Sequence, residues 1–186
     1  MASAFSHAFI AIAICKTYTG AARPLRFWVL AALCAVVPDA DVVGFAFGIS
    51  YGDMMGHRGL THSLLFALVL GFMVVALAFR EVPRWTRAWW TLGACFFVVT
   101  ASHGVLDALT NGGLGVAFFA PFSSARYFWP WRPVEVSPIG VAPFFSARGL
   151  TVIASELVWL WLPGAALMSC AWAYRRLKGQ GAGGKT

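Results

Sequence analysis

Long apolar runs with almost no charge constrain this chain more than any other feature. Five such runs are present: residues 2–15, 25–37, 60–79, 88–109 and 150–174. Their charged side chains are limited to Arg26, Asp107 and Glu156. A helix needs about 20 apolar residues to cross the hydrocarbon core of a bilayer. The last three runs are therefore predicted to span a membrane. The first two are shorter, and Pro38 is expected to end the second.

The overall composition supports the same fold class. Hydrophobic residues make up 60% of the chain and charged residues 11%, whereas a soluble domain carries about 25% charged residues. This excludes a disordered chain, a coiled coil and a small disulfide scaffold. We predict an all-α integral membrane bundle of four to five helices. It would form one domain over residues 1–174, followed by a basic, glycine-rich cytoplasmic tail over residues 175–186.

The basic residues give an orientation. The net charge is +7, and the Lys and Arg residues gather between the apolar runs, around residues 16–26, 80–87 and 175–178. Basic loops are typical of the cytoplasmic side of a membrane. Because no polar domain accompanies them, membrane lipids are the expected partner and nucleic acid is not. The sequence gives no oligomeric state.

The histidines and aspartates all fall at the opposite, extracytoplasmic end of the predicted bundle. These eight residues are His7, Asp39, Asp41, Asp53, His57, His62, His103 and Asp107. Only Lys and Arg set the orientation, so this convergence is an independent observation. Ionisable groups in or beside membrane helices are costly and by default mark function.

Imidazole and carboxylate groups are the usual ligands of zinc, manganese and iron. His103 and Asp107 share a helix face at the i, i+4 spacing, and His62 is expected in the first turn of the third helix. Their number exceeds the three protein ligands of one open catalytic site, so one or two ions are predicted, with zinc favoured. Taken singly, His7 suits a hydrogen-bonded core histidine, and Asp39 and Asp41 suit a capped helix end.

The residues and motifs that carry a family resemblance are His7, PDAD at 38–41, HRGLTHS at 57–63, SHGVLDALTNGG at 102–113 and PFSSARYFWPWRPVEVSP at 121–138. In these segments the chain resembles the YdjM-type family, bacterial inner-membrane proteins described as metal-dependent hydrolases. The order of His and Asp is also distantly similar to zinc-dependent phospholipase C, although that superfamily's later His and Glu ligands have no counterpart here. The resemblance implies a multi-pass inner-membrane protein that binds a divalent metal through His7, Asp39, His57, His62, His103 and Asp107.

The resulting hypothesis is a hydrolase for a phosphoester or lipid-linked phosphate at the outer interface. Asp41 or Asp53 is expected to accept a proton, and Asp41 is favoured because it lies two residues from Asp39, which is expected to act in catalysis as well as in metal binding. Arg58, Arg126 and Arg132 are candidates to bind substrate phosphate, and Arg58 also to assist the reaction. Their alternative role is contact with lipid headgroups or loops.

An alternative from another class is a non-enzymatic membrane protein with a structural or transported metal. Transport is disfavoured because the cytoplasmic halves of the predicted helices carry no ionisable groups.

Overall fold

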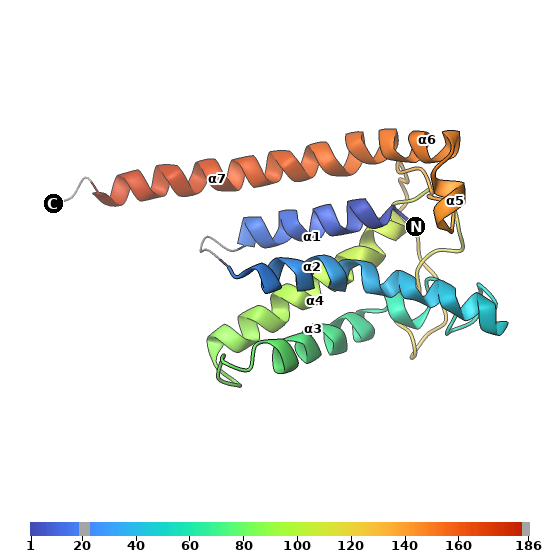
Figure 1. Cartoon of the computed structure of the whole chain (residues 1–186), viewed down its shortest axis with the longest axis horizontal. Helices are drawn as coiled ribbons and strands as arrows, with labels where there is room; N and C mark the ends of the chain where they lie inside the picture. Colours follow the sequence, from blue (N-terminus) through green and yellow to red (C-terminus); the bar gives the residue numbers. More distant parts are fainter. Residues whose placement is uncertain (19–22, 184–186) are drawn as a thin grey trace.

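The computed structural model describes residues 1–18 and 23–183, and within them the regular structure is helical apart from two isolated β-bridges. The long helices lie side by side (Figure 1). In chain order the elements are α1 (Ala4–Tyr18), α2 (Leu25–Val36), the 3₁₀ helices η1 (Val37–Phe47) and η2 (Leu60–His62), α3 (Leu64–Ala78), α4 (Arg87–Ala108), α5 (Val141–Phe144), α6 (Ala147–Glu156), the π-helix η3 (Leu157–Trp161) and α7 (Leu162–Gly183). The predicted all-α membrane bundle is confirmed.

Several elements join end to end. The helix α2 continues directly into η1, while α6 and η3 continue into α7, so the described residues form five helical rods beside the short η2 and α5. Three rods are long and apolar enough to cross a membrane: Leu25–Phe47, Arg87–Ala108 and Ala147–Lys178. The last three residues of the predicted tail, 184–186, lie outside the described part.

The second rod is longer than the sequence predicts. The α-helix ends at Val36, just before Pro38 as predicted, but the chain runs on as a 3₁₀ helix through Phe47, which the sequence did not predict. Pro38 lies at the start of η1, where its missing N–H does not break an established ladder. Gly48, with φ of 78°, ends the rod in the left-handed conformation. This extension carries Asp39 and Asp41.

The third rod is shorter than predicted. Ser63 adopts an extended conformation and its side chain accepts a hydrogen bond from Phe66 N–H, which is the geometry of an N-cap. The helix α3 therefore begins at Leu64 and has 15 residues, a length of about 22 Å. It is too short for the predicted span of about 30 Å. His62 consequently lies in η2 rather than in the first turn of α3.

The fifth rod contains a wide turn beside Pro163. A proline lacks the N–H that an α-helix would use and commonly kinks a helix. The structure instead places the π-helix η3 just before it, and the rod continues through it in Figure 1. Glu156 is the last residue before this wide turn.

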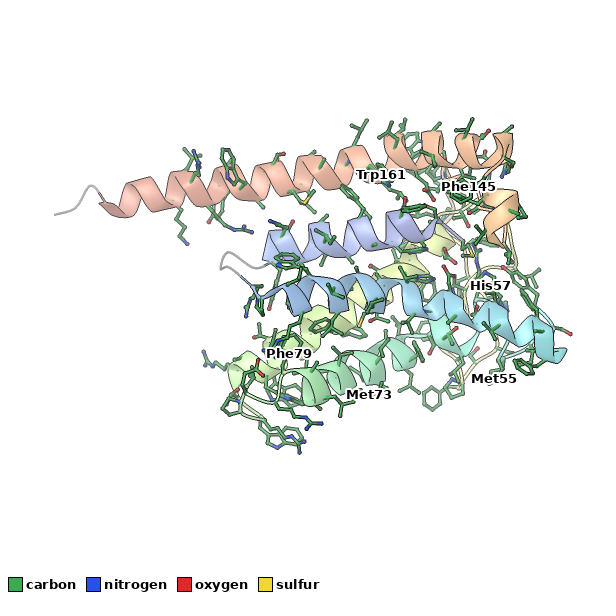
Figure 2. All side chains as sticks on the ribbon, viewed as in Figure 1. Met55, His57, Met73, Phe79, Phe145 and Trp161 are labelled. Carbon is green, nitrogen blue, oxygen red and sulfur yellow. The ribbon has the colours of Figure 1, made fainter. Side chains whose placement is uncertain are left out.

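The rods pack through an apolar core shared by α1, α2, α3 and α4. Phe27 and Phe96 are fully buried and meet edge to face with ring centroids 5.6 Å apart. Gly71 of α3 lies against the backbone of α4, where a Cβ would be 2.6 Å from Phe97 N. Large apolar side chains such as Leu68 and Met73 remain exposed on α3, and Figure 2 shows side chains covering the outside of the rods. This suits a bundle surrounded by lipid.

The segment from Thr110 to Ser146 folds over one end of the bundle. Two isolated bridges, Thr110 with Val134 and Val116 with Tyr127, organise it. It is joined to the loop before η2 by the hydrogen bond from Ala117 N to Arg58 O, 3.0 Å. His57 lies at this end of the molecule (Figure 2). The long connection thus covers the end at which the histidines and aspartates were predicted to meet.

Candidate metal centre

Residues from four helical elements and one loop meet at the covered end of the bundle. His7 comes from α1, Asp39 and Asp41 from η1, His57 from the loop before η2, His62 from η2, and His103 and Asp107 from α4. The structure therefore brings together every residue that the sequence analysis proposed as a ligand. Asp53 lies outside the cluster, where it is exposed and its carboxylate accepts a hydrogen bond from Ser50 N, 2.8 Å.

Four buried side chains form the first donor group: Asp39, His62, His103 and Asp107. His103 Nε2 lies 3.0 Å from His62 Nε2 and 3.3 Å from Asp39 Oδ1. His62 Nε2 lies 3.6 Å from both Asp39 Oδ1 and Asp107 Oδ2. A tetrahedral zinc site with bonds of about 2.0–2.2 Å has donor atoms about 3.3–3.6 Å apart. These four donor distances lie in or just below that range, and all the donor atoms lie within 4.8 Å of one another, so the group approaches the spacing of such a site.

The hydrogen bonds of the two central histidines leave their Nε2 atoms facing each other. His103 Nδ1 lies 2.6 Å from Ala35 O, which can only accept, so this nitrogen donates. His62 Nδ1 faces Asp41 Oδ2 at 3.2 Å. The two Nε2 atoms lie 3.0 Å apart, so a proton on His62 or a metal cation must join them. Backbone and carboxylate partners of this kind commonly orient metal-binding imidazoles.

A second donor group, formed by Asp41, His57 and His62, shares His62 with the first. His57 Nδ1 lies 2.7 Å from Asp41 Oδ1. The other carboxylate oxygen accepts from Thr61 Oγ1 at 2.7 Å and from Arg58 N at 3.2 Å. Asp41 lies between His57 and His62 and therefore orients both imidazole rings. Three protein donors would leave an open position on an ion held here.

Unpartnered polar atoms identify this cluster as a site. Of the eight buried side-chain N and O atoms without a hydrogen bond among the described residues, seven belong to it. They are both ring nitrogens of His7, both carboxylate oxygens of Asp39, His57 Nε2, Arg58 Nε and Asp107 Oδ2. Four of them still lie within ion-pair distance of an opposite group: Arg58 Nε and Asp107 Oδ2 face each other, His7 Nε2 faces Asp107, and Asp39 Oδ1 faces His103. Among the described residues, His7 Nδ1, Asp39 Oδ2 and His57 Nε2 have neither kind of partner. Buried polar atoms are rarely left unpaired, and a bound ion is one standard way of satisfying them. The donor set thus fits a divalent cation.

The electrostatics of the site also favour positive charge. Burial alone would lower the pKa of His62, but hydrogen bonds to Asp107, Asp39 and Asp41 outweigh it and raise this pKa to about 10. Three carboxylates thus surround one imidazole. A cation that replaces the proton gains the same attraction.

Comparison with known proteins gives the family. The model of the YdjM inner membrane protein family matches residues 1–179. The chain belongs to this family. It is 38% identical over 179 residues to the inner membrane protein YbcI of Escherichia coli strain K12, covering 95% of this chain and 100% of that protein. No solved structure matches the chain. The predicted family and the inner-membrane location are thereby confirmed.

The side chain of Arg58 points into the interior of the protein. It is fully buried, with φ of 64°. Its guanidinium donates to Gly112 O and Thr110 Oγ1, both at 2.9 Å, and pairs with Asp107 Oδ2 at 3.0 Å. Its geometry suits positioning of Asp107. The predicted roles of Arg58 in catalysis and in substrate binding stay predictions.

The other two arginines are placed differently. Arg126 donates to the carbonyl oxygens of His57, Tyr51 and Asp53 at 3.0–3.2 Å, so it fastens the loop that carries His57. Arg132 is exposed and lies over the ring of Phe128, 4.6 Å from its centroid. Neither position tests the predicted contact with a phosphate.

Glu156 is a buried group to which the sequence analysis assigned no role. Its carboxylate accepts from Ser3 N, from Ser3 Oγ at 2.6 Å and from Ser6 Oγ at 2.7 Å. Trp161 Nε1 donates to Ser6 Oγ at 2.7 Å. This network holds the first turn of α1 in place, and its member Ser6 directly precedes His7. An isolated acid in the longest apolar run is the sequence signal that marks it.

The fixed N-terminal segment reaches the cluster directly. Ala2 N donates to Asp107 Oδ1 at 2.8 Å, and His7 Nε2 lies 3.4 Å from the same oxygen. The His7 ring stacks on His103 with centroids 3.7 Å apart. His7 therefore borders the first donor group rather than completing it, and its predicted role as a ligand stays a prediction.

Proposed function

We propose that this YdjM-family protein is a membrane-bound, metal-dependent hydrolase of a phosphoester or lipid-linked phosphate. The site would face the extracytoplasmic interface of the inner membrane, and zinc is the favoured ion. The observation that carries the proposal is the pair of donor groups sharing His62, of which the second has three protein donors. A bound divalent ion would supply a hydroxide from water and polarise a phosphoryl oxygen.

The chain's own residues have separate tasks in this proposal. Asp39, His62, His103 and Asp107 would hold one ion, and Asp41 and His57 would join His62 around a second ion with an open position. The Asp41 oxygen that does not bind this ion would accept a proton after its hydrogen bonds rearrange. Arg58 keeps Asp107 ionised and in place through their 3.0 Å contact. The location supports a lipid substrate, because the cluster lies at one end of an apolar bundle, where lipid headgroups meet the protein.

A structural metal is the second candidate, and one observation favours it. The first group offers four donors, which would close a tetrahedral shell, whereas catalytic zinc keeps a position open. In this case the ion would join η1, η2 and α4 without turnover. The two functions differ in whether the metal-loaded protein hydrolyses anything.

The deciding experiment combines metal analysis with a lipid-phosphate assay. Detergent-purified wild type is expected to contain one or two divalent ions per chain and to release phosphate or headgroup from a panel of lipid phosphates. His62→Ala and His103→Ala should lose the metal and the activity together. Asp53→Asn is the matched control, since Asp53 lies at the same end outside both donor groups, and it should retain both.

Each outcome separates the candidates. Metal retained by wild type, without turnover on any lipid phosphate with zinc, manganese or iron, would favour the structural role. Unchanged metal content in both histidine variants would contradict the site itself.

A further inference from the structure

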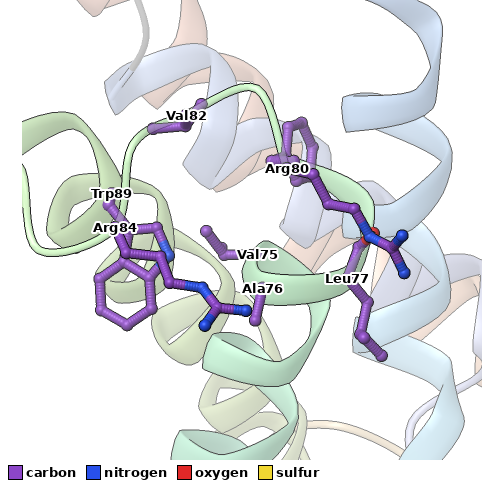
Figure 3. Close-up of a pocket in the computed structure, with 8 residues that line it drawn as sticks. Val75, Ala76, Leu77, Arg80, Val82, Arg84 and Trp89 are labelled. Carbon is purple, nitrogen blue, oxygen red and sulfur yellow. The ribbon is translucent and has the colours of Figure 1, made fainter.

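A second polar site lies at the other end of the bundle, at the turn between α3 and α4. A cavity of about 310 Å³ opens there. Figure 3 shows Arg84 and Trp89 on one side of it and Arg80 and Leu77 on the other. The remaining lining is apolar and includes Val75, Phe79 and Val82. The cavity thus combines an apolar floor with guanidinium groups.

These guanidinium groups have no acidic partner among the described residues. Glu81, the acid of this turn, pairs with Arg26 of α2. Arg80 donates through Nε to Leu77 O at 3.2 Å. Within residues 1–18 and 23–183, neither Arg80 nor Arg84 forms an ion pair. The cavity therefore carries uncompensated positive charge.

Trp89 provides a second and independent observation. It is 7% exposed, and its indole Nε1 is buried without a hydrogen-bond acceptor. Among the described residues, Trp89 Nε1 is the one buried side-chain N or O atom without a hydrogen bond that lies outside the histidine–aspartate cluster and its neighbour Arg58. A buried N–H is expected to have a partner. The residue lines the cavity, so an acceptor bound there would satisfy it.

We infer that this cavity binds the phosphate group of an anionic membrane phospholipid. The guanidinium groups of Arg84 and Arg80 would neutralise the phosphate, and Trp89 Nε1 would donate to one of its oxygens. The apolar floor at Val75 and Phe79 would contact the glycerol and the first acyl carbons. Neither a soluble phosphate nor an uncharged lipid uses both parts of the cavity. This site is independent of the metal centre and of its proposed activity.

Native mass spectrometry of the delipidated full chain tests the inference. Phosphatidylglycerol should bind at least tenfold more tightly than phosphatidylcholine. Arg84→Gln should weaken phosphatidylglycerol binding roughly tenfold, and Trp89→Phe roughly three- to tenfold, as expected for loss of a charged and of a neutral hydrogen bond. Arg176→Gln is the matched control, because Arg176 lies over the ring of Trp172 outside the cavity. It should leave binding unchanged.

Two further measurements keep the inference open to contradiction. Thermal unfolding in detergent should be the same for wild type and the three variants, so that a loss of binding is not a loss of fold. Soluble glycerophosphoglycerol should compete at least a hundredfold more weakly than the lipid. Equal competition, equal binding of phosphatidylcholine, or wild-type affinity in both cavity variants would each overturn the assignment.

Discussion

Arg58 shows at the scale of one residue how a buried charge is held in a membrane bundle. It has no exposed surface, and its three contacts are a carboxylate, a hydroxyl and a backbone carbonyl. A planar guanidinium can reach all three at once, whereas an ammonium is a single point charge. Because Asp107 is one of the partners, the identity of this side chain should affect the metal centre as well as stability.

Arg58→Lys is therefore expected to lower the free energy of unfolding by about 2–4 kcal/mol. It should also reduce metal retention by placing Asp107 less firmly. Thermal unfolding and metal analysis in detergent measure the two effects. Arg132→Lys, an exposed position over the Phe128 ring, should change stability by less than about 0.5 kcal/mol. Equal changes of stability and metal content in Arg58→Lys and Arg132→Lys would contradict the role of Arg58 in positioning Asp107.

Glu156 acts at the same scale but through another element. Glu156→Ala leaves Ser3 N and the Ser3 and Ser6 hydroxyls without their acceptor and should cost about 2–4 kcal/mol. Glu156→Gln keeps one acceptor oxygen and should restore part of that loss. Glu135→Gln, which breaks the partly exposed pair with Arg148, is the control. If Glu156 positions His7, metal content should also fall in the alanine variant and recover partly in the glutamine variant.

At the scale of elements, α3 and α4 pack closely because glycines replace larger side chains between them. A Cβ at Gly71 would meet the backbone of α4 at 2.6 Å from Phe97 N, whereas a Cβ at Gly52 would have only Leu114 near it, at 3.9 Å. Backbone atoms of a packed helix cannot move aside as a flexible side chain can. The two glycines thus form a matched pair.

Gly71→Ala is expected to destabilise the bundle by about 1–3 kcal/mol, since the two helices must separate. Gly52→Ala should be close to neutral. Thermal unfolding of the two variants in the same detergent makes the comparison. A neutral Gly71→Ala variant would mean that α3 and α4 are less tightly packed than the structure shows.

The sequence predicts this architecture well where one physical signal dominates. Apolar runs locate the five rods, and the cost of ionisable groups near lipid predicts that His7, His62 and His103 share one end. The residues at which some helices begin or end were not predicted, because they depend on local hydrogen bonds. Pro38 tolerates the 3₁₀ continuation into η1, and Ser63 caps α3 three residues after the apolar run begins. The partners of Arg58 and Glu156 depend on contacts between distant segments, which no spacing rule reveals.

At the scale of the whole molecule, the histidine–aspartate cluster and the arginines of the α3–α4 turn lie at opposite ends of the bundle. We expect the end with Asp53 to face outward and the turn with Arg84 to face the cytoplasm. In a variant whose native cysteines are replaced, Asp53→Cys should react with a membrane-impermeant maleimide in intact spheroplasts. Arg84→Cys should react only after permeabilisation. The reverse pattern would invert the orientation and place the proposed hydrolase site inside.

Metal removal should also act on the whole fold, because the first donor group joins η1, η2 and α4. A strong chelator is expected to lower the thermal midpoint of wild type by several degrees. The His62→Ala/His103→Ala double variant should show no shift with chelator. Restoring zinc to the treated wild type should recover the midpoint. A chelator effect of the same size on the double variant would show that the metal binds elsewhere.

The short rods α1 and α3 have 15 residues each, and each is about 22 Å long, shorter than the roughly 30 Å of a bilayer's hydrocarbon layer. Lipids beside them are expected to compress to cover the mismatch. The membrane beside each of these two helices would then be locally thin. Its headgroups would be drawn down toward the ends of α1 and α3, which are the ends next to His7 and His62.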